Sequence, residues 1–304
     1  MDRARPISGT LPPAAAPGSR RIDEALRSLQ RRLAAGAARL PADASVEDVH
    51  QARVTARRLR SHLRTFEPLL DARRARRYRA KLREYARALA EVREADVREA
   101  LLVPLARRDA RMTPAGFHRL SVQLEGARHA ARDALRRRMS DPRWAALCRA
   151  LDPQAASGPL LVRRDAGVEE VLRLVRRAWC RARKRLGHGR RDVEALHELR
   201  LALKHCRYAV EAVADVEPEA AERLLRRLRA AQDRIGEHRD LVLARHWLEA
   251  NERSLGATLV RRLDERVDGR LETLHGQALG RSERVLPAYR RWRRASRRVR
   301  RAGP

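Results

Sequence analysis

The sequence predicts an all-α protein built by internal duplication, and three observations carry this prediction. Apolar residues recur every three or four positions from about residue 20 almost to the end of the chain, which is the period of an amphipathic helix. No segment alternates between apolar and polar residues, as a half-buried strand would. Two blocks of sequence also occur once in each half of the chain, in the same order.

The chain begins with a segment that predicts no packed structure. Residues 1–19 are rich in proline and alanine and lack the apolar core of a signal peptide, so we expect a disordered tail. A first helix follows and ends at residues 41–45. Ser45, with Asp48 three residues later, predicts a capping box that begins the next helix.

Further breaks divide the rest of the first half. Corners are expected at Pro68–Asp71 and at residues 112–115, where Pro114 suits the first position of a helix. The strongest break in the chain is the proline-containing and glycine-containing segment that starts at Leu151. We therefore expect one helical bundle over residues 20–150 and a linker over residues 151–165.

The second half predicts a similar run of helices, so each half has about four. They are expected at about residues 166–187, 192–215, 217–250 and 254–286, separated by Gly187–Gly189, Pro218 and Gly256. These helices form the second predicted bundle, residues 166–289. An arginine-rich tail over residues 290–304 completes the expected organisation.

The internal repeat is clearest when His50 is aligned with His197. VEDVHQARVTARRLRSHLRTF then lies over VEALHELRLALKHCRYAVEAV, and farther on LAEVREADV (89–97) matches IGEHRDLVL (235–243). Both long segments carry an apolar seam with the spacing of a helix packed in a bundle. The seam residues are Val49, Ala52, Ala56, Leu59, Leu63 and Phe66 in the first half, and Leu196, Leu199, Leu203, Cys206, Val210 and Val213 in the second.

A stripe of basic residues, each one position after a seam residue, flanks both seams. The basic stripes are His50, Arg53, Arg57, Arg60 and Arg64 in the first half, and His197, Arg200, Lys204 and Arg207 in the second, where Glu211 ends the pattern. On a helix these side chains lie about 100° from the seam, next to the core. Basic residues recur on the following helix of each half and are expected to face the same groove: Arg77, Lys81, Arg223 and Arg227.

The overall charge supports a polyanionic partner. The formal net charge is +31, from 70 Lys+Arg against 39 Asp+Glu, and only three of the basic residues are lysine. Codon bias also explains the excess of arginine over lysine. It does not explain the net charge, because it would not reduce the number of acidic residues. Nucleic acid, a phosphate polymer and an acidic membrane all fit such a charge. Aromatic residues make up 3% of the chain, too few for a row of base-stacking platforms.

Other interpretations of the stripes stay open. The arginines also fit an ordinary charged surface, and His50 and His197 also fit packing or capping roles, because a helix N-terminus disfavours a nearby cation. The pairs Arg93-Glu94 and Arg239-Asp240 also fit structural ion pairs. The C-terminal arginines fit either a contact with nucleic acid or a disordered solubilising end.

The motifs of phosphate-processing and metal-dependent enzymes are missing from the sequence. There is no P-loop, HExxH or GxSxG motif, and the scattered histidines form no pair at metal-ligand spacing. We therefore expect a protein that is not an enzyme and has no cofactor or metal. Three widely spaced cysteines and the absence of a long apolar run predict a soluble cytoplasmic protein without membrane insertion.

These segments resemble the CHAD family, the conserved histidine α-helical domain. VHQARVTARRLRSHLRTF and LHELRLALKHCRYAVE each contain His-x-x-Arg followed by basic residues, and LAEVREADV and IGEHRDLVL are similar to the family's Leu-Gly-x-x-Arg-Asp-x-Asp-Val block. Three positions depart from the family pattern. Ala90 replaces a glycine, Val242 replaces an acid and Cys206 replaces a leucine.

The resemblance covers about residues 20–290 and implies two four-helix bundles related by a pseudo-two-fold axis. It implies a basic central groove or pore that binds inorganic polyphosphate, and association with polyphosphate granules. No ExExK motif is present, so the resemblance is to a stand-alone member without a CYTH domain. A nucleic-acid-binding protein that uses the same basic surface and the C-terminal arginines is the alternative. The sequence does not indicate an oligomeric state.

Overall fold

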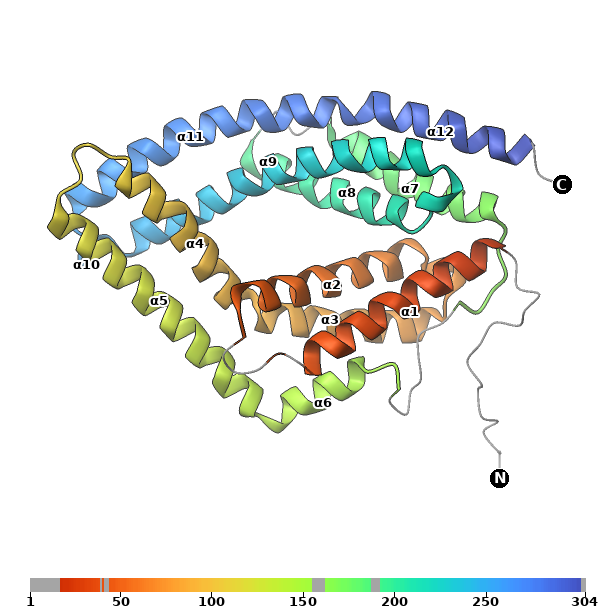
Figure 1. Cartoon of the computed structure of the whole chain (residues 1–304), viewed down its shortest axis with the longest axis horizontal. Helices are drawn as coiled ribbons and strands as arrows, with labels where there is room; N and C mark the ends of the chain where they lie inside the picture. Colours follow the sequence, from red (N-terminus) through yellow and green to blue (C-terminus); the bar gives the residue numbers. More distant parts are fainter. Residues whose placement is uncertain (1–16, 39, 41–43, 155–161, 187–191, 302–304) are drawn as a thin grey trace.

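A computed structural model describes residues 17–38, 40, 44–154, 162–186 and 192–301, which form an all-α fold (Figure 1). Within these ranges the extended pairing is limited to an isolated bridge between Leu70 and Val162. Residues 1–16 of the predicted tail, residues 155–161 of the predicted linker and the break at residues 187–189 lie outside the described residues. Residues 17–19 of the predicted tail instead belong to the first helix. No helix in the described part of the chain is long and apolar enough to cross a bilayer.

Helices run through both halves of the chain. The first half contains α1 (Pro17–Ala38), α2 (Val46–Thr65), the 3-10 turn Glu67–Leu69, α3 (Ala72–Ala88), α4 (Ala90–Arg107), α5 (Pro114–Ser140) and α6 (Pro142–Leu151). The second contains α7 (Val168–Leu186), α8 (Val193–Glu211), the 3-10 turn Ala214–Val216, α9 (Pro218–Ala250), α10 (Glu252–Leu255), α11 (Ala257–Glu283) and α12 (Val285–Arg301). The duplication itself stays a prediction.

Both halves have more helices than the four expected. In the first half two local signals were missed. Leu89 is the C-cap of α3 and also precedes α4, so the chain turns where α9 continues as one helix. Asp141 begins α6 by accepting a hydrogen bond at 2.8 Å from the backbone N–H of Arg143, with Pro142 at the first helical position.

Two of the predicted helix starts are confirmed in atomic detail. The Ser45 hydroxyl accepts from the Asp48 backbone N–H at 3.1 Å, and the Asp48 carboxylate accepts from the Ser45 N–H at 3.1 Å. Thr113 caps α5 by accepting from the N–H of Gly116, and Pro114 occupies the first turn. Both caps satisfy backbone N–H donors that the first turn of a helix leaves unpaired, and the Ser45–Asp48 cap does so reciprocally.

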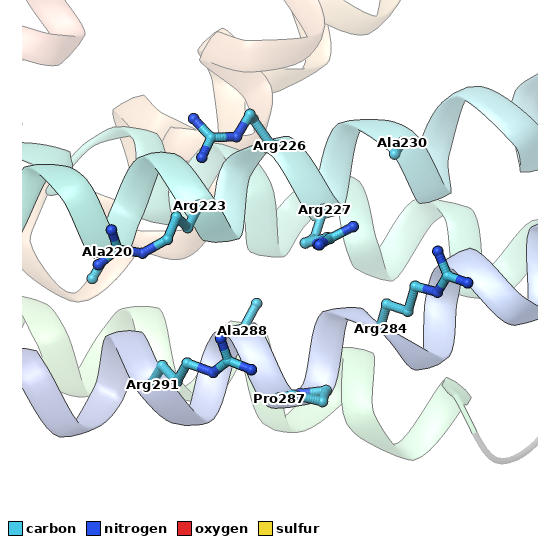
Figure 2. A pocket seen from close by; sticks show the side chains of 9 residues that line it. All are labelled: Ala220, Arg223, Arg226, Arg227, Ala230, Arg284, Pro287, Ala288 and Arg291. Carbon is cyan, nitrogen blue, oxygen red and sulfur yellow. The ribbon is translucent and has the colours of Figure 1, made fainter.

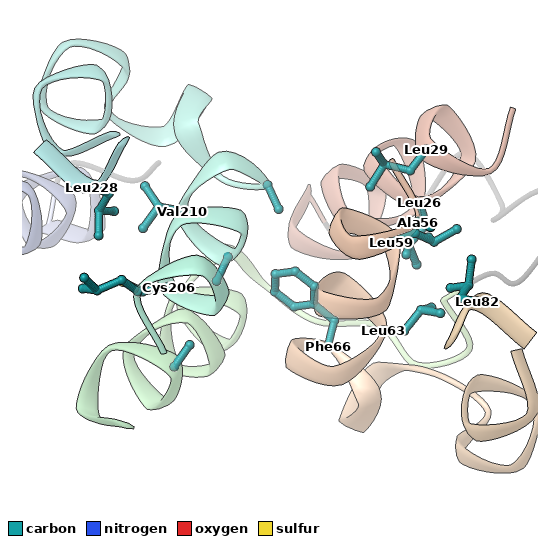
Figure 3. Close-up of a cluster of buried hydrophobic side chains, with 14 of the residues drawn as sticks. Leu26, Leu29, Ala56, Leu59, Leu63, Phe66, Leu82, Cys206, Val210 and Leu228 are labelled. Atoms are coloured by element: carbon teal, nitrogen blue, oxygen red, sulfur yellow. The ribbon is translucent and has the colours of Figure 1, made fainter. Parts of the chain in front are cut away.

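The predicted apolar seams of α2 and α8 are confirmed, because all twelve residues are at most 4% exposed. They belong to one large hydrophobic cluster that joins the halves. Phe66, at the end of α2, points toward the second half, where Cys206 and Val210 of α8 and Leu228 of α9 lie (Figure 3). The seam residues therefore connect the two halves as well as packing within each.

Neither hydrophobic cluster belongs to one half of the chain. The larger contains residues of α1, α2 and α3 together with residues of α7, α8 and α9. The second, at the other end of the molecule, combines α4 and α5 with the C-terminal part of α9, α10 and α11. The predicted boundaries 20–150 and 166–289 therefore divide the sequence, but the packed cores extend across them.

The predicted tail at residues 290–304 is not separated from the bundle, since α12 continues through it to Arg301. Tyr289 stacks on Trp179 of α7 with ring centroids 3.8 Å apart, and Trp292 is 2% exposed. These aromatic residues and Ser296 lie at helical spacing between the arginines, so one face of α12 is buried. This buried face is the reason that the segment is an ordered helix.

Candidate polyanion-binding site

Helices α2 and α8, which carry the basic stripes, lie against each other across the two halves. Ser61 Oγ of α2 is 2.8 Å from His205 Nδ1 of α8, within hydrogen-bonding distance. Arg58 Nε of α2 is 3.5 Å from Glu211 Oε2, the acid that ends the second stripe. The packing of α2 on α8 therefore brings the two stripes together.

The stripes meet in a group of cations, here called the central cluster: Arg57, Arg93, Arg200, Lys204 and Arg207. Burial lowers the pKa of Arg57, and the charges of Arg207 and Arg93 lower it further. Burial, followed by the charges of Arg200 and Arg57, lowers the pKa of Lys204 to about 6. Such a group of like charges is unfavourable unless an anion joins it.

Asp240 of α9 is an acid that faces the central cluster. Burial raises the pKa of this carboxyl group, while the nearby charges of Arg200, Arg93 and Lys204 oppose the rise. Glu211 lies farther along α8, with its Oε1 3.6 Å from Arg207 Nε. Asp233 also acts on Arg200, so three carboxylates stand against five basic side chains, and a multivalent anion would neutralise the remaining positive charge.

Gly236 makes room for Arg200 on the surface of α9. A Cβ at Gly236 would lie 3.1 Å from Arg200 Nη2 and 3.4 Å from Nε, a tight contact. Ala90 occupies the corresponding position in the first half, and Arg53, the counterpart of Arg200, instead donates from Nη1 to the Ala86 carbonyl at 2.8 Å. The two halves therefore hold equivalent arginines differently.

Several polar nitrogens of the stripes are buried and have no hydrogen-bond partner within the described part of the chain. They are Arg57 Nε, Arg200 Nε, Arg207 Nε and His197 Nδ1. A buried polar group without a partner costs roughly 1–3 kcal/mol. N–H groups of this kind can donate to acceptors such as phosphate oxygens.

His50 and His197 occupy equivalent places in the first turns of α2 and α8, and both are half-buried. Burial, followed by the charge of Arg93, lowers the pKa of His50. Burial, followed by the charge of Arg239, lowers the pKa of His197. Both imidazoles are therefore neutral at pH 7 and can donate one N–H each.

The basic stripes continue away from the histidines toward α7. Burial and then the charge of Arg83 lower the pKa of Arg60. Arg64, Arg181 and His205 line a cavity of about 510 Å³ between α2, α7 and α8. Burial, followed by the charges of Arg64 and Arg181, lowers the pKa of His205 to about 4. Basic side chains thus also lie at this end of the contact between α2 and α8, together with Glu198, which lines the same cavity.

The predicted pair on α3 does not reach this surface. Arg77 and Lys81 are exposed, and Lys81 Nζ lies 3.4 Å from Glu84. The charges of a different set of α3 residues, Arg79, Arg83 and Arg87, act on Arg60. These three recur every four residues and share one face of the helix, which is turned toward α2.

The predicted pair on α9 also lies elsewhere. Arg223 and Arg227 line a groove between α9 and α12. The residues of α9 that face the central cluster are Gly236 and Asp240. At 100° per residue, Arg223 and Arg227 are about 100° to 180° around the helix from them. The structure therefore separates these two arginines from the basic stripes.

No group of three His, Cys, Asp or Glu side chains is placed to hold a metal ion in the ranges that the structure describes.

A family model described as CHAD domain matches residues 15–249. This chain belongs to the CHAD family. Two solved structures share the CHAD fold with it. PptA from Streptomyces chartreusis has a TM-score of 0.72 and 20% sequence identity, covering 88% of this chain and 100% of that chain. The CHAD domain from the plant Ricinus communis has a TM-score of 0.65 and 22% identity, covering 90% and 92%. No curated protein matches this chain.

Some residues around the CHAD site were ambiguous or missed in the sequence. Arg93 and Asp240 belong to the repeated CHAD block, and an ion-pair role fitted them equally well in the sequence. In the structure Arg93 is part of the central cluster and Asp240 faces it. His205 and Arg181 stand outside the repeated pattern. Gly236 is the glycine of the CHAD block, and a Cβ there would press on the Arg200 guanidinium.

Proposed function

We propose that this CHAD protein binds inorganic polyphosphate between α2 and α8 and does not catalyse a reaction on it. The CHAD family is known to bind polyphosphate. The observation that carries the proposal is the central cluster, where basic side chains from both halves converge and burial with neighbouring charge lowers the pKa of Lys204 to about 6. A polyanion would stabilise the charged forms of this half-buried group of basic side chains.

The chemistry of polyphosphate suits the basic stripes. Each phosphate of the polymer carries about one negative charge and offers acceptor oxygens to planar guanidinium groups. Neutralising those charges releases counterions from the polymer, which favours binding as it does on DNA. Polyphosphate has no bases and needs no aromatic platforms, in keeping with the 3% aromatic content.

The proposal of binding without catalysis rests on the residue types of the stripes. Enzymes of phosphoryl transfer combine cationic side chains with carboxylates that hold Mg²⁺. The stripes themselves contain only histidine, arginine and lysine. Asp240 and Glu211 lie beside them, but no group of three His, Cys, Asp or Glu side chains in the described part of the chain is placed to hold a metal ion. We expect no loss of chain length when long-chain polyphosphate is incubated with the protein and Mg²⁺ and then analysed by gel electrophoresis.

The site also suggests a cellular role. A protein that binds the polymer without consuming it would collect where the polymer is stored, so we propose association with polyphosphate granules in the cytoplasm. A fluorescent fusion of the full chain should lie on granules in cells that contain them. It should spread through the cytoplasm in cells that lack polyphosphate.

The binding proposal is tested with the double variant Arg57→Ala, Arg200→Ala. We expect weaker binding of long-chain polyphosphate, with a slope of log K against log salt reduced by about one to two units, because roughly one counterion is released per contact. The matched control is Arg31→Ala, Arg32→Ala, which removes two exposed arginines from α1. Unchanged affinity and slope in a folded double variant would contradict the proposal.

The same measurement separates polyphosphate from nucleic acid. Duplex DNA is added at matched phosphate concentration and physiological salt. We expect polyphosphate to displace DNA, because the half-buried cluster accommodates a thin chain more readily than a duplex. If DNA displaces polyphosphate instead, the basic surface is a nucleic-acid site.

A further inference from the structure

A second concentration of arginines lies outside the basic stripes, in a groove of about 640 Å³ between α9 and the start of α12. Figure 2 shows the side chains from both helices along this groove. Small residues line it between the helices: Ala220, Ala230, Pro287 and Ala288. The basic side chains that line it are Arg223, Arg226, Arg227, Arg284 and Arg291. No acidic residue lines this described groove.

The groove is elongated. A neighbouring cavity of about 360 Å³ shares Arg284 with it and adds Arg234 and Arg281. The two cavities together, here called the outer arginine groove, follow α9 from Ala220 to Arg234. At 1.5 Å per residue this is about 21 Å, a length that suits a linear anion better than a compact one.

The arginines of the outer arginine groove differ in their partners. Arg223 lies 3.4 Å from Glu219, and Arg226 pairs with Glu222 on the same helix. Arg227, Arg284 and Arg291 form no ion pair with any residue that the structure describes. Guanidinium groups on both walls are therefore available to an external anion, and their mutual repulsion would decrease when one binds.

We propose that the outer arginine groove is a second binding site for linear polyphosphate, so that one protein molecule holds two segments of polymer. This inference rests on the proposed function. The length of the groove favours a linear chain, and its positive lining favours a high charge density. No aromatic side chain lines it, so bases would find no stacking surface, which favours polyphosphate over single-stranded nucleic acid.

The two sites are separated by helix α9. Gly236 and Asp240 face the central cluster, whereas Arg223 and Arg227 face α12. A chain in one site therefore leaves the other open. Long polyphosphate gains affinity by reaching both sites, since a second contact within one complex is effectively intramolecular. Two protein molecules can likewise share one chain, which gives the protein a way to cross-link the polymer.

The test compares the triple variant Arg227→Ala, Arg284→Ala, Arg291→Ala with the central variant Arg57→Ala, Arg200→Ala. Isothermal titration with a short polyphosphate should give two chains per wild-type molecule and one chain for each variant. Light scattering with long-chain polyphosphate should show large assemblies for the wild type and for neither of these two variants. Arg20→Ala, Arg31→Ala, Arg32→Ala removes the same charge from exposed positions on α1 and should behave as the wild type.

The outcomes separate this inference from the proposed function. If the triple variant keeps wild-type stoichiometry, the inference is wrong and the central site is unaffected. If the central variant keeps wild-type stoichiometry while the triple variant loses one chain, the proposed function fails and the outer site stands. Displacement of short polyphosphate from the outer site by duplex DNA at matched phosphate concentration would assign the groove to nucleic acid and overturn the inference. The single variants Arg227→Ala and Arg291→Ala repeat the test if the triple variant does not fold by circular dichroism.

Discussion

Lys204 occupies a position that is unfavourable for a charge in the free protein. Burial and the cations Arg200, Arg57 and Arg207 lower its pKa to about 6, and Asp240 opposes the shift only in part. In the unfolded chain its pKa is about 10.4. Between these values the unfolded state binds the extra proton, so this residue's contribution to stability falls as pH decreases from about 10 toward 6.

Replacing Lys204 by methionine should stabilise the free protein and weaken polyphosphate binding. The variant no longer releases a proton on folding, so its melting temperature should rise by a few degrees at pH 7. It also lacks a cation of the central cluster. Lys81→Met, at an exposed site on α3, is the control and should change neither property. A Lys204→Met protein that is less stable but binds normally would show that the amine is structural.

The pH dependence of binding should distinguish Lys204 from the histidines. A bound polyanion raises the pKa of Lys204, so affinity should strengthen by up to about tenfold per unit as pH falls from 8 to 6. Burial lowers the pKa of both His50 and His197 from 6.5, so their protonation contributes only at lower pH. The His50→Gln, His197→Gln variant should keep the dependence above pH 6.5, and Lys204→Met should lose it. The reverse pattern would assign the proton uptake to the histidines.

At the scale of the helix, the absence of a side chain at Gly236 leaves room for the Arg200 guanidinium. A Cβ there would meet Arg200 Nη2 at 3.1 Å. Gly236→Ala should therefore displace the Arg200 guanidinium and weaken polyphosphate binding several-fold. The same change should favour helix α9 by up to about 1 kcal/mol. We thus expect higher helix stability together with lower affinity, measured by thermal unfolding and by titration.

Helix α11 offers a matched control for this change. A Cβ at Gly269 or Gly276 would meet no atom within 4 Å, so alanine at either place alters helix propensity alone. These variants should gain stability and bind polyphosphate as the wild type does. If Gly236→Ala binds equally well, the contact with Arg200 does not position that arginine for the ligand.

At the scale of the whole molecule, both hydrophobic clusters join the halves of the chain. Separation within residues 155–161 would expose the seam of α2 around Phe66 and the facing residues of α8. It would also divide the cluster that α4 and α5 share with α9 and α11. We expect each half expressed alone to be insoluble or poorly folded by circular dichroism. A half that folds and binds long polyphosphate with wild-type affinity would contradict a single shared site.

Local features of the sequence determined the helices and the seams. The Ser45–Asp48 capping box and the 3.6-residue period of the seams involve residues close in the chain, so their physics is visible without the fold. The same period placed the basic stripes beside the core. The sequence did not predict the helices α10 and α12. The buried face of α12 around Trp292 lies between many arginines, so its apolar pattern was hard to recognise.

Tertiary packing decided which arginines meet. This chain has arginines on nearly every helical face, so spacing alone did not show whether Arg77 or Arg79 and Arg83 of α3 lie near the first basic stripe. Spacing also did not predict the groove at Arg223 and Arg227. The rotation of each helix depends on contacts between residues far apart in the sequence. Those contacts turned Asp240 toward α8, and they alone determine where the positive charge of the chain is concentrated.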